Sequence, residues 1–494
     1  TYSMIAHVNA HGQPALFPDV YNANFFRTPS VVYIGREGCL VGAAAEELLE
    51  DAPALPVMRF VKARLGQSGW AYTDHQKRQW TAEALSALIV KKLLNDADTF
   101  ANDDLGPAVI TVPAQFTDEQ RRAVLSAADL AGLGNIKLVE EPVAAATYFG
   151  LGAKTGEHTF LVYDFGGGTF DVSIVQTAKE GLYMLATDGI SQLGGRFLDE
   201  QVMEFIASDY RQRTGRSPLD DPGAAQRLRR LAEDSKIKMS KPAMPQVKQS
   251  LLLLGEAYDF VFTRQQFDTI ALAAVRKTLA ACERCLSAAS LTWKDIDKIL
   301  LIGGSSLLPQ VTVEILRMSG KSTRDLISKQ PHQAVAFGAA ILAQQLNRDT
   351  STDGAIRQVA GADLCLRIWD RQKKQMGLET LISRNTPLPA AYSRTFFTSR
   401  DDQTRVVLEF VQRRGDPAEE FSLGHFAFGP LDNPRRNYPI EVTVALGRDG
   451  LVRITARDQV MGTEMAYALE ESSQRRRTAN EEQRRLVESV VVNG

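Results

Sequence analysis

The sequence predicts a multidomain protein in which an α/β region is followed by an almost wholly β region. Residues 1–350 alternate short apolar runs with amphipathic stretches of helical period. Beyond residue 364, β-prone segments are joined by turn residues. Between the two regions lies "LNRDTSTDGAIRQVAGAD" (346–363), a polar, glycine-containing stretch that indicates a linker. A chain of 494 residues can hold two or three domains, each with its own core.

Composition excludes several classes of function. With 44% hydrophobic residues, 23% charged residues and a net charge of −2, the chain gives no electrostatic reason to expect nucleic acid or a membrane as a partner. No apolar run approaches the length of a membrane span. The four cysteines imply no disulfide framework and fit a reducing, cytoplasmic location. Cys282 and Cys285 form a Cys-x-x-Cys without further ligands nearby, which favours a structural role.

Periodicity predicts the elements of the first region in order. Strands are expected at 29–34, 107–112, 159–164, 170–176, 182–188 and 298–302. Helices are expected at 80–95, 117–131, 198–213, 224–240 and 264–289. In the second region, "PIEVTVALGRDGLVRITARD" predicts a hairpin that turns at 448–450. The charged stretch from about residue 474 predicts a helix.

The stretch "LVYDFGGGTFDVSIV" (161–175) carries the strongest functional signal. Three glycines follow a buried strand and precede another strand, so they form a hairpin rather than a glycine loop that feeds a helix. Glycine lets the backbone amides approach a bulky anion, and the carboxylates of Asp164 and Asp171 can hold Mg²⁺ through its waters. A tight turn without a ligand is the alternative, and the acidic residues and Thr169 at these offsets make it the less favoured one.

Three further sites are weaker in isolation. Gly303-Gly304 ends a buried strand before a helix, where a plain capped turn is as good an interpretation as a ligand edge. Glu141 follows a strand and could orient a water, or could simply be an acidic residue at a helix N-terminus. Lys62 in "MRFVKARLG" would by default be an exposed lysine on an amphipathic helix.

Taken in this order and spacing, these motifs resemble the heat-shock-70 chaperone family, the DnaK-like proteins. The resemblance spans nearly the whole chain through "VITVPAQFTDEQRRAV", "VEEPVAAATYFG", "VYDFGGGTFDVSIV", "LGGRFLDE", "AEDSKIKMS", "LIGGSSLLPQV" and "QAVAFGAAILA". It continues in the β region through "TLISRNTPLP" and "SLGHFAF". It implies an actin-like two-lobed ATPase domain at 1–350, a linker at 351–363, a β-sandwich peptide-binding domain at 364–473 and a short helical remnant of the lid at 474–494.

The resemblance also implies residue roles. Lys62 and Glu141 would act on the attacking water and the γ-phosphate, and Asp164 with Asp171 would hold Mg²⁺. The phosphates of ATP or ADP would lie against Thr169, Thr1, Tyr2 and the glycines Gly166, Gly167 and Gly168. The nucleoside would be bordered by Gly195, Glu233, Lys236, Ser240, Gly303, Gly304 and Ser305. An extended apolar peptide would contact Ile368, Phe397, Val406 and Leu408, although these residues could equally form the core of the β domain.

The chain departs from the family pattern in several places. The family's first strand would lie before Thr1, so we expect a fragment of a longer chain. Leu307 and His332 replace an arginine and an aspartate of the nucleoside site. The linker reads "IRQV" instead of a leucine-rich run, so Arg357 and Gln358 should resist burial and the linker should dock poorly. "DRQKKQM" occupies a loop that arches over the peptide in relatives, and the helical lid is short.

The leading prediction is therefore an ATP-driven chaperone-like protein that binds unfolded peptide, with a J-domain co-chaperone and a nucleotide-exchange factor as expected partners. The alternative is a nucleotide-binding regulator or interaction protein of the same family with little turnover. A sugar kinase of the same fold superfamily is disfavoured by the β region after residue 364.

Overall fold

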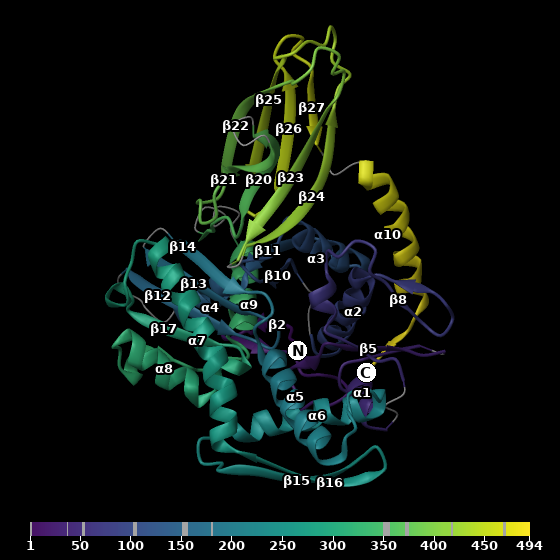
Figure 1. Cartoon of the computed structure of the whole chain (residues 1–494), viewed down its shortest axis with the longest axis vertical. Helices are drawn as coiled ribbons and strands as arrows, with labels where there is room; N and C mark the ends of the chain where they lie inside the picture. Colours follow the sequence, from purple (N-terminus) through teal and green to yellow (C-terminus); the bar gives the residue numbers. More distant parts are fainter. Residues whose placement is uncertain are drawn as a thin grey trace.

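The computed structural model describes residues 2–36, 38–51, 55–101, 106–150, 157–178, 181–348, 356–370, 375–415, 418–467 and 471–494. Within them the chain forms a mixed α/β body with several sheets, from which a wholly β unit projects (Figure 1). This confirms the predicted α/β region followed by a β region.

A six-stranded sheet forms the centre of one half of the body. Its order is β18-β17-β12-β13-β14-β19. The strands are β12 (His158–Phe165), β13 (Phe170–Ala178), β14 (Gly181–Ile190), β17 (Lys298–Ile302), β18 (Leu326–Ile327) and β19 (Ile356–Arg357). The middle of β12 is apolar on both faces, and β13 is buried from Phe170 to Val175 although Asp171 and Ser173 lie on one of its faces, so both strands are covered on both sides of the sheet.

Four helices and a hairpin share the largest core cluster with this sheet, and the third of these helices packs directly on β13 and β14. They are α5 (Gly195–Thr214), α6 (Pro222–Met239), α7 (Arg264–Ala288) and α8 (Pro309–Ser319), with the hairpin β15 (Gln246–Leu253) and β16 (Glu256–Thr263). Thr263 begins α7 with a reciprocal capping box to Gln266, as its sequence pattern favours. Cys282 and Cys285 of α7 are buried free cysteines, in keeping with a structural role.

The other half of the body holds smaller sheets. Its strands are β1 (Tyr2–Ser3), β2 (Ala6–Val8), β3 (Pro14–Leu16), β4 (Thr28–Pro29), β5 (Val31–Ile34), β6 (Cys39–Val41), β7 (Met58–Arg59), β8 (Tyr72–Thr73), β9 (Gln79–Trp80), β10 (Ala108–Val112), β11 (Ile136–Glu140) and β28 (Val492–Asn493). Its helices are α1 (Ala43–Asp51), α2 (Ala82–Phe100), α3 (Asp118–Leu130), α4 (Glu141–Gly150) and α9 (Ala334–Arg348). The predicted helices and strands of the α/β region are all present, with ends shifted by a few residues.

The β unit consists of two four-stranded antiparallel sheets around one core. The first has the order β21-β20-β23-β24 and the second the order β22-β25-β26-β27. The strands are β20 (Asp363–Asp370), β21 (Gln375–Ile382), β22 (Ala390–Phe397), β23 (Val406–Arg414), β24 (Glu419–Phe428), β25 (Pro439–Leu446), β26 (Val452–Asp458) and β27 (Glu464–Tyr467). The predicted hairpin is β25–β26, and Gly450 takes the left-handed backbone (φ 73°) of its turn.

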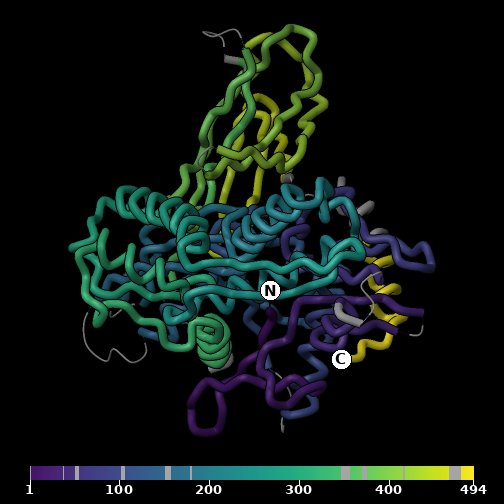
Figure 2. The backbone as a smooth tube through the Cα atoms, turned by 60° about the horizontal axis from the view of Figure 1, so that its bottom comes forward, coloured from purple at the N-terminus to yellow at the C-terminus, as the bar shows by residue number. Residues whose placement is uncertain are grey.

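Helix α10 (Glu471–Ser489) leaves the β unit and runs back along α2, and both chain ends lie in the α/β body (Figures 1 and 2). None of the helices in the described ranges has the length and apolar character that spanning a bilayer requires.

The β unit is docked on the body, and the expectation of a poorly docking linker is wrong. Strand β19 pairs in parallel with β14, and Gln358 is buried. The side chain of Gln358 accepts a hydrogen bond from the Glu140 amide (3.2 Å) and donates one to the Arg448 carbonyl (2.8 Å). The predicted cost assumed burial without partners, whereas both polar ends of Gln358 are satisfied. Arg357 stays exposed, with its guanidinium 5.3 Å from the Tyr183 ring centre.

Two further groups of contacts fasten the docked unit. At the start of α3, the Asp118 amide donates to Gln412 (2.9 Å), and the Asp118 carboxylate accepts from the Val452 amide (2.7 Å). At the end of β14, Arg384 of the β unit pairs with the buried carboxylate of Asp188 (3.4 Å). The buried side chains of Gln358, Asp118 and Asp188 thus each have a partner across this interface.

Candidate functional site

The glycine hairpin joins β12 to β13 and brings two carboxylates face to face. Asp164 and Asp171 are direct partners in the antiparallel register. The Gly166 amide donates to the Thr169 carbonyl (3.1 Å) and closes the turn. The predicted strand–hairpin–strand arrangement is therefore present.

Negative charge is crowded at this hairpin. Burial raises the pKa of Asp164 well above its usual value, and Glu141 and Asp171 raise it further, while Lys62 opposes them. Burial and Glu141 raise the pKa of Asp171 to about 6, and the hydrogen bond from Thr169 limits the rise. A site that holds carboxylates together at this cost is suited to a cation.

Lys62 and Glu141 meet beside these carboxylates. The Lys62 ammonium nitrogen lies 2.8 Å from Oε1 of Glu141. Nearly half of the Lys62 side chain is accessible (47%), whereas Glu141 is 16% exposed. Desolvation lowers the pKa of Lys62, but Glu141, Asp164 and Asp171 together raise it above its usual value. The lysine therefore stays charged and serves as the counter-ion of the acidic cluster.

The local backbone explains both positions. Lys62 is exposed, as the default expectation had it, but it lies in a 3-10 turn, η1 (Val61–Arg64), and not on an amphipathic α-helix. Phe60 precedes this turn in the left-handed region (φ 61°), which redirects the chain after β7. Glu141 is the first residue of α4, directly after β11.

The N-terminus of α5 packs against the other side of the hairpin. The amides of Gly195 and Arg196 donate to the carbonyls of Gly166 (2.9 Å) and Gly167 (2.8 Å). Ser305 Oγ donates to the Gly166 carbonyl (2.9 Å). A Cβ on Gly194 would lie 2.6 Å from the Gly167 backbone, so close contact requires glycine there. The structure thus brings Ser305 and Gly195 to the predicted hairpin.

Gly303 and Gly304 border the same hairpin from the end of β17. Gly303 has a left-handed backbone (φ 78°), and a Cβ there would lie 2.5 Å from the Phe165 carbonyl oxygen. A Cβ on Gly304 would lie 2.9 Å from Cε1 of His332. His332 therefore packs on the glycine turn, and burial lowers its pKa, with Arg27 adding to the effect.

The remaining residues predicted for the nucleoside lie on α6. Lys236 pairs with Asp199 (2.7 Å) and donates to the Gly195 carbonyl (3.2 Å). Ser240 Oγ donates to the Lys236 carbonyl (2.8 Å), and Glu233 pairs with Arg59 (3.4 Å) across the two halves of the body.

Tyr2 is exposed, with the Arg27 guanidinium 4.4 Å from its ring centre, and Thr1 lies outside the described residues.

In the described part of the chain, no group of three or more histidine, cysteine or acidic side chains is arranged to hold a metal ion. Asp164 and Asp171 could contribute to a Mg²⁺ site in which waters and phosphate oxygens supply the other ligands. Their mutual crowding fits this use, since a divalent cation would offset it.

The four residues predicted to contact peptide occupy different environments. Leu408 belongs to the core of the β unit, and Ile368 and Val406 pack against that core. Phe397 is 58% exposed at the end of β22. The "DRQKKQM" loop falls largely outside the described residues.

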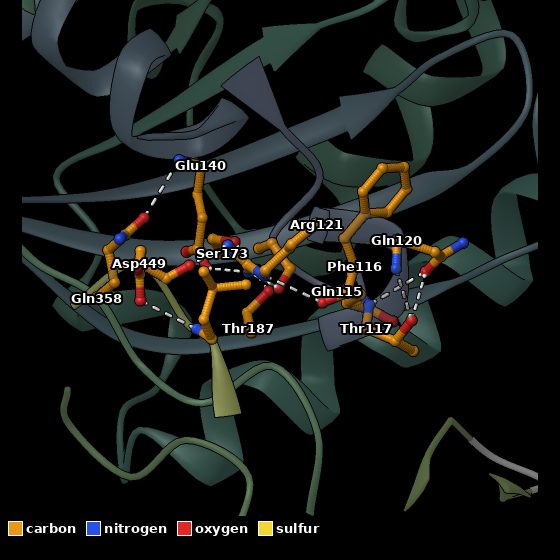
Figure 3. A network of polar contacts seen from close by, with 12 residues as sticks. Gln115, Phe116, Thr117, Gln120, Arg121, Glu140, Ser173, Thr187, Gln358 and Asp449 are labelled. Atoms are coloured by element: carbon orange, nitrogen blue, oxygen red, sulfur yellow. Dashed lines mark hydrogen bonds and ion pairs between the residues drawn. The ribbon is translucent and has the colours of Figure 1, made fainter. Parts of the chain in front are cut away.

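A buried polar network joins the site to the docked β unit (Figure 3). The Arg121 guanidinium pairs with Glu140 (2.6 Å) and donates to the carbonyls of Phe116 (3.1 Å) and Asp449 (3.3 Å). Figure 3 shows Arg121 between Glu140 and Phe116. Burial raises the pKa of Glu140 to about 7, and Arg121 moderates the rise. Glu140 directly precedes Glu141, so the network ends at the site.

This network and the close contact at Gly194 were not predicted from the sequence. Gly194 could have been found as the first glycine of "LGG", directly before a helix, a position where glycine allows close backbone contact. Arg121 and Glu140 lie in ordinary helix and strand sequence, and only the tertiary arrangement pairs them.

Comparison with known proteins gives a consistent picture. The model of the Hsp70 protein family matches residues 40–491. The chaperone protein DnaK of Thermotoga petrophila is 32% identical over 503 residues, which covers 99% of this chain and 82% of that protein. The chaperone protein DnaK of Thermotoga maritima gives the same identity and coverage.

Proposed function

Because this chain belongs to the Hsp70 protein family, we propose that it is an ATP-dependent chaperone that binds extended apolar peptide segments. Residues 1–350 would be an actin-like ATPase domain and residues 364–473 a β-sandwich peptide-binding domain. One observation carries the proposal. The opposed carboxylates of Asp164 and Asp171 lie beside the Lys62–Glu141 pair, on a glycine hairpin backed by a helix N-terminus.

This arrangement suits phosphoryl transfer to water. Such a reaction needs positioned donors and a positioned water more than covalent chemistry. Mg²⁺ held near Asp164 and Asp171 would take up the charge of the phosphate oxygens. The hairpin residues 166–169 would hold the phosphates, Lys62 would donate to the transferring group, and Glu141 would orient the water through the oxygen that does not face Lys62.

The docked β unit supports a link between the nucleotide and peptide sites. Gln358 and Arg121 each contact Glu140 and also a carbonyl of the β25–β26 turn. A change in the position of Glu141 would therefore be transmitted to the β unit through the adjacent Glu140. Among the predicted peptide residues, Phe397 is the exposed one and would make the first contact. J-domain and nucleotide-exchange proteins would be the partners of such a cycle.

The alternative of a regulator with little turnover is not favoured, since Lys62, Glu141, Asp164 and Thr169 occupy one site. Single-turnover hydrolysis of ATP, with and without Mg²⁺, tests the proposal together with fluorescence anisotropy of a labelled apolar peptide. Hydrolysis that requires Mg²⁺ and alters peptide release is expected. Absence of both ATP binding and peptide binding would refute it.

A further inference from the structure

The last strand of the chain extends the sheet that leads to Lys62. In β28, Val492 pairs with Cys39 and Asn493 with Leu40, parallel to β6. The Cys39 amide donates to the Val491 carbonyl (3.0 Å). The sheet continues as β28-β6-β5-β7, and η1 with Lys62 follows directly after β7. The C-terminal strand is thus connected to the lysine through one continuous sheet.

The same segment contributes to the core beneath the lysine. Val487, Val490 and Val492 are 1%, 6% and 9% exposed. They share a hydrophobic cluster with Val61 and Leu65, which flank Lys62 in the sequence. The C-terminal segment and η1 therefore share one core, although they lie more than 400 positions apart in the chain, and both pack on α2.

Polar contacts fix the register of the segment. The buried side chain of Gln483 accepts a hydrogen bond from the Thr81 amide (3.0 Å) and donates one to the Gln79 carbonyl (2.9 Å). Lys91 donates to the Val487 carbonyl (3.3 Å) near the end of α10. Buried polar groups that must be matched allow one alignment of the segment, which a purely apolar contact would not enforce.

We propose that residues 483–493 form a strap that positions Lys62 for the reaction. The inference rests on the proposed ATPase function. When the strap is seated, it completes the sheet and the core that hold η1, and Lys62 reaches Glu141 at 2.8 Å. When the strap is released, β6 becomes an edge strand, and the core that Val61 and Leu65 share loses Val487, Val490 and Val492. A displacement of about 1 Å at a catalytic group can reduce a rate about 10²-fold.

Adjacent valines provide a matched test in the full-length chain. Val492→Asp places a charge in the core cluster, whereas Val491→Asp changes a side chain that is 66% exposed and keeps the carbonyl that Cys39 contacts. We expect Val492→Asp to speed hydrogen exchange of the Cys39 amide and to slow single-turnover hydrolysis about tenfold, with ATP affinity nearly unchanged. Val491→Asp should behave as wild type. Val492→Ile, which keeps an apolar side chain in the core cluster, should hydrolyse ATP at the wild-type rate.

A second measurement does not depend on turnover. Released from Glu141, the Lys62 amine should react faster with an acylating reagent, which mass spectrometry can follow at this residue. Faster acylation in Val492→Asp but not in Val491→Asp would support the strap even if the wild type hydrolysed no ATP, a result that would contradict only the proposed function. If Val492→Asp does not fold, Val492→Ala provides the same comparison. Faster exchange at Cys39 with unchanged acylation and hydrolysis would overturn the inference.

Discussion

The Lys62 ammonium and the Glu141 carboxylate lie 2.8 Å apart, where the turn after β7 meets the start of α4. Each side chain fixes the position of the other, although the strands that precede them, β7 and β11, belong to different sheets. We predict that Lys62→Ala or Glu141→Ala slows single-turnover hydrolysis by about 10²–10³ and changes ATP affinity much less. Rapid-quench kinetics and calorimetry separate the two effects. Lys248→Ala, at an exposed position on β15, should leave both unchanged, and equal losses of rate and affinity would contradict the assignment.

Substitutions in the glycine hairpin should instead weaken the binding of ATP itself. Asp164→Ala removes one of the two opposed carboxylates, and Gly167→Val places a side chain where the phosphates would lie. Both variants should weaken Mg²⁺-dependent ATP binding strongly, measured by calorimetry. Gly134→Val serves as the control, because nothing lies within 4 Å of its Cβ position. Unchanged affinity in both site variants would exclude this hairpin as the phosphate site.

Gln358 should contribute to docking through its two hydrogen bonds. Gln358→Ala leaves the Glu140 amide and the Arg448 carbonyl without that partner, which should weaken docking by about 1–3 kcal/mol. Hydrogen exchange at the Glu140 amide and ATP-dependent peptide release should both report the change. Arg357→Ala removes only an exposed side chain and should have a small effect. If Arg357→Ala weakened docking more than Gln358→Ala does, the contact of Arg357 with the Tyr183 ring would be the one that holds the linker.

Glu140 should make stability depend on pH. Its pKa is raised to about 7 in the folded chain, mainly by burial, against about 4.3 in an unfolded chain. The folded state therefore binds the proton more tightly, and the stability from this group decreases as pH rises from about 4.3 to about 7. Glu140→Gln keeps an acceptor for Arg121 and removes the buried charge.

Chemical unfolding at pH 5 and pH 8 measures this effect. Between pH 5 and pH 8 the free energy of unfolding of wild type should fall by about 1–3 kcal/mol relative to that of the Glu140→Gln variant. Glu464→Gln, at an exposed position on β27, should track the wild type at both values. If the free energies of unfolding of Glu140→Gln and wild type differed by the same amount at pH 5 and at pH 8, the prediction would be contradicted.

Local patterns made much of the α/β body predictable. The apolar run before Asp164 and the glycines after it specify a strand and a turn within a few residues, so the hairpin followed from sequence. Thr117 and Thr263 carry capping patterns that place the starts of α3 and α7. The roles proposed for Lys62, Glu141, Asp164 and Asp171 came from motif order, and the structure brings these four residues together.

The features that could not be predicted depend mostly on contacts between distant parts of the chain. The docking of Gln358 depends on an amide in β11 and a carbonyl in the turn after β25, and neither can be inferred from the linker itself. Strand β28 is two residues long and pairs with the other end of the chain. Lys62 lies in a 3-10 turn because Phe60 redirects the backbone, which a helical pattern does not reveal.

The β unit is attached to the α/β body at both ends, by β19 on β14 and by β28 on β6. The chain between these strands is therefore a closed loop. If one of the two strands detaches, the strand that stays paired holds the detached strand close to its pairing site. The effective concentration of the detached strand at that site is then high, on the order of millimolar for short flexible connections. Rebinding is then intramolecular and independent of protein concentration. Large separation of the two units requires both strands to be free at once and the contacts of Asp118 and Asp188 to be broken as well, so full release should be rarer than the detachment of one strand.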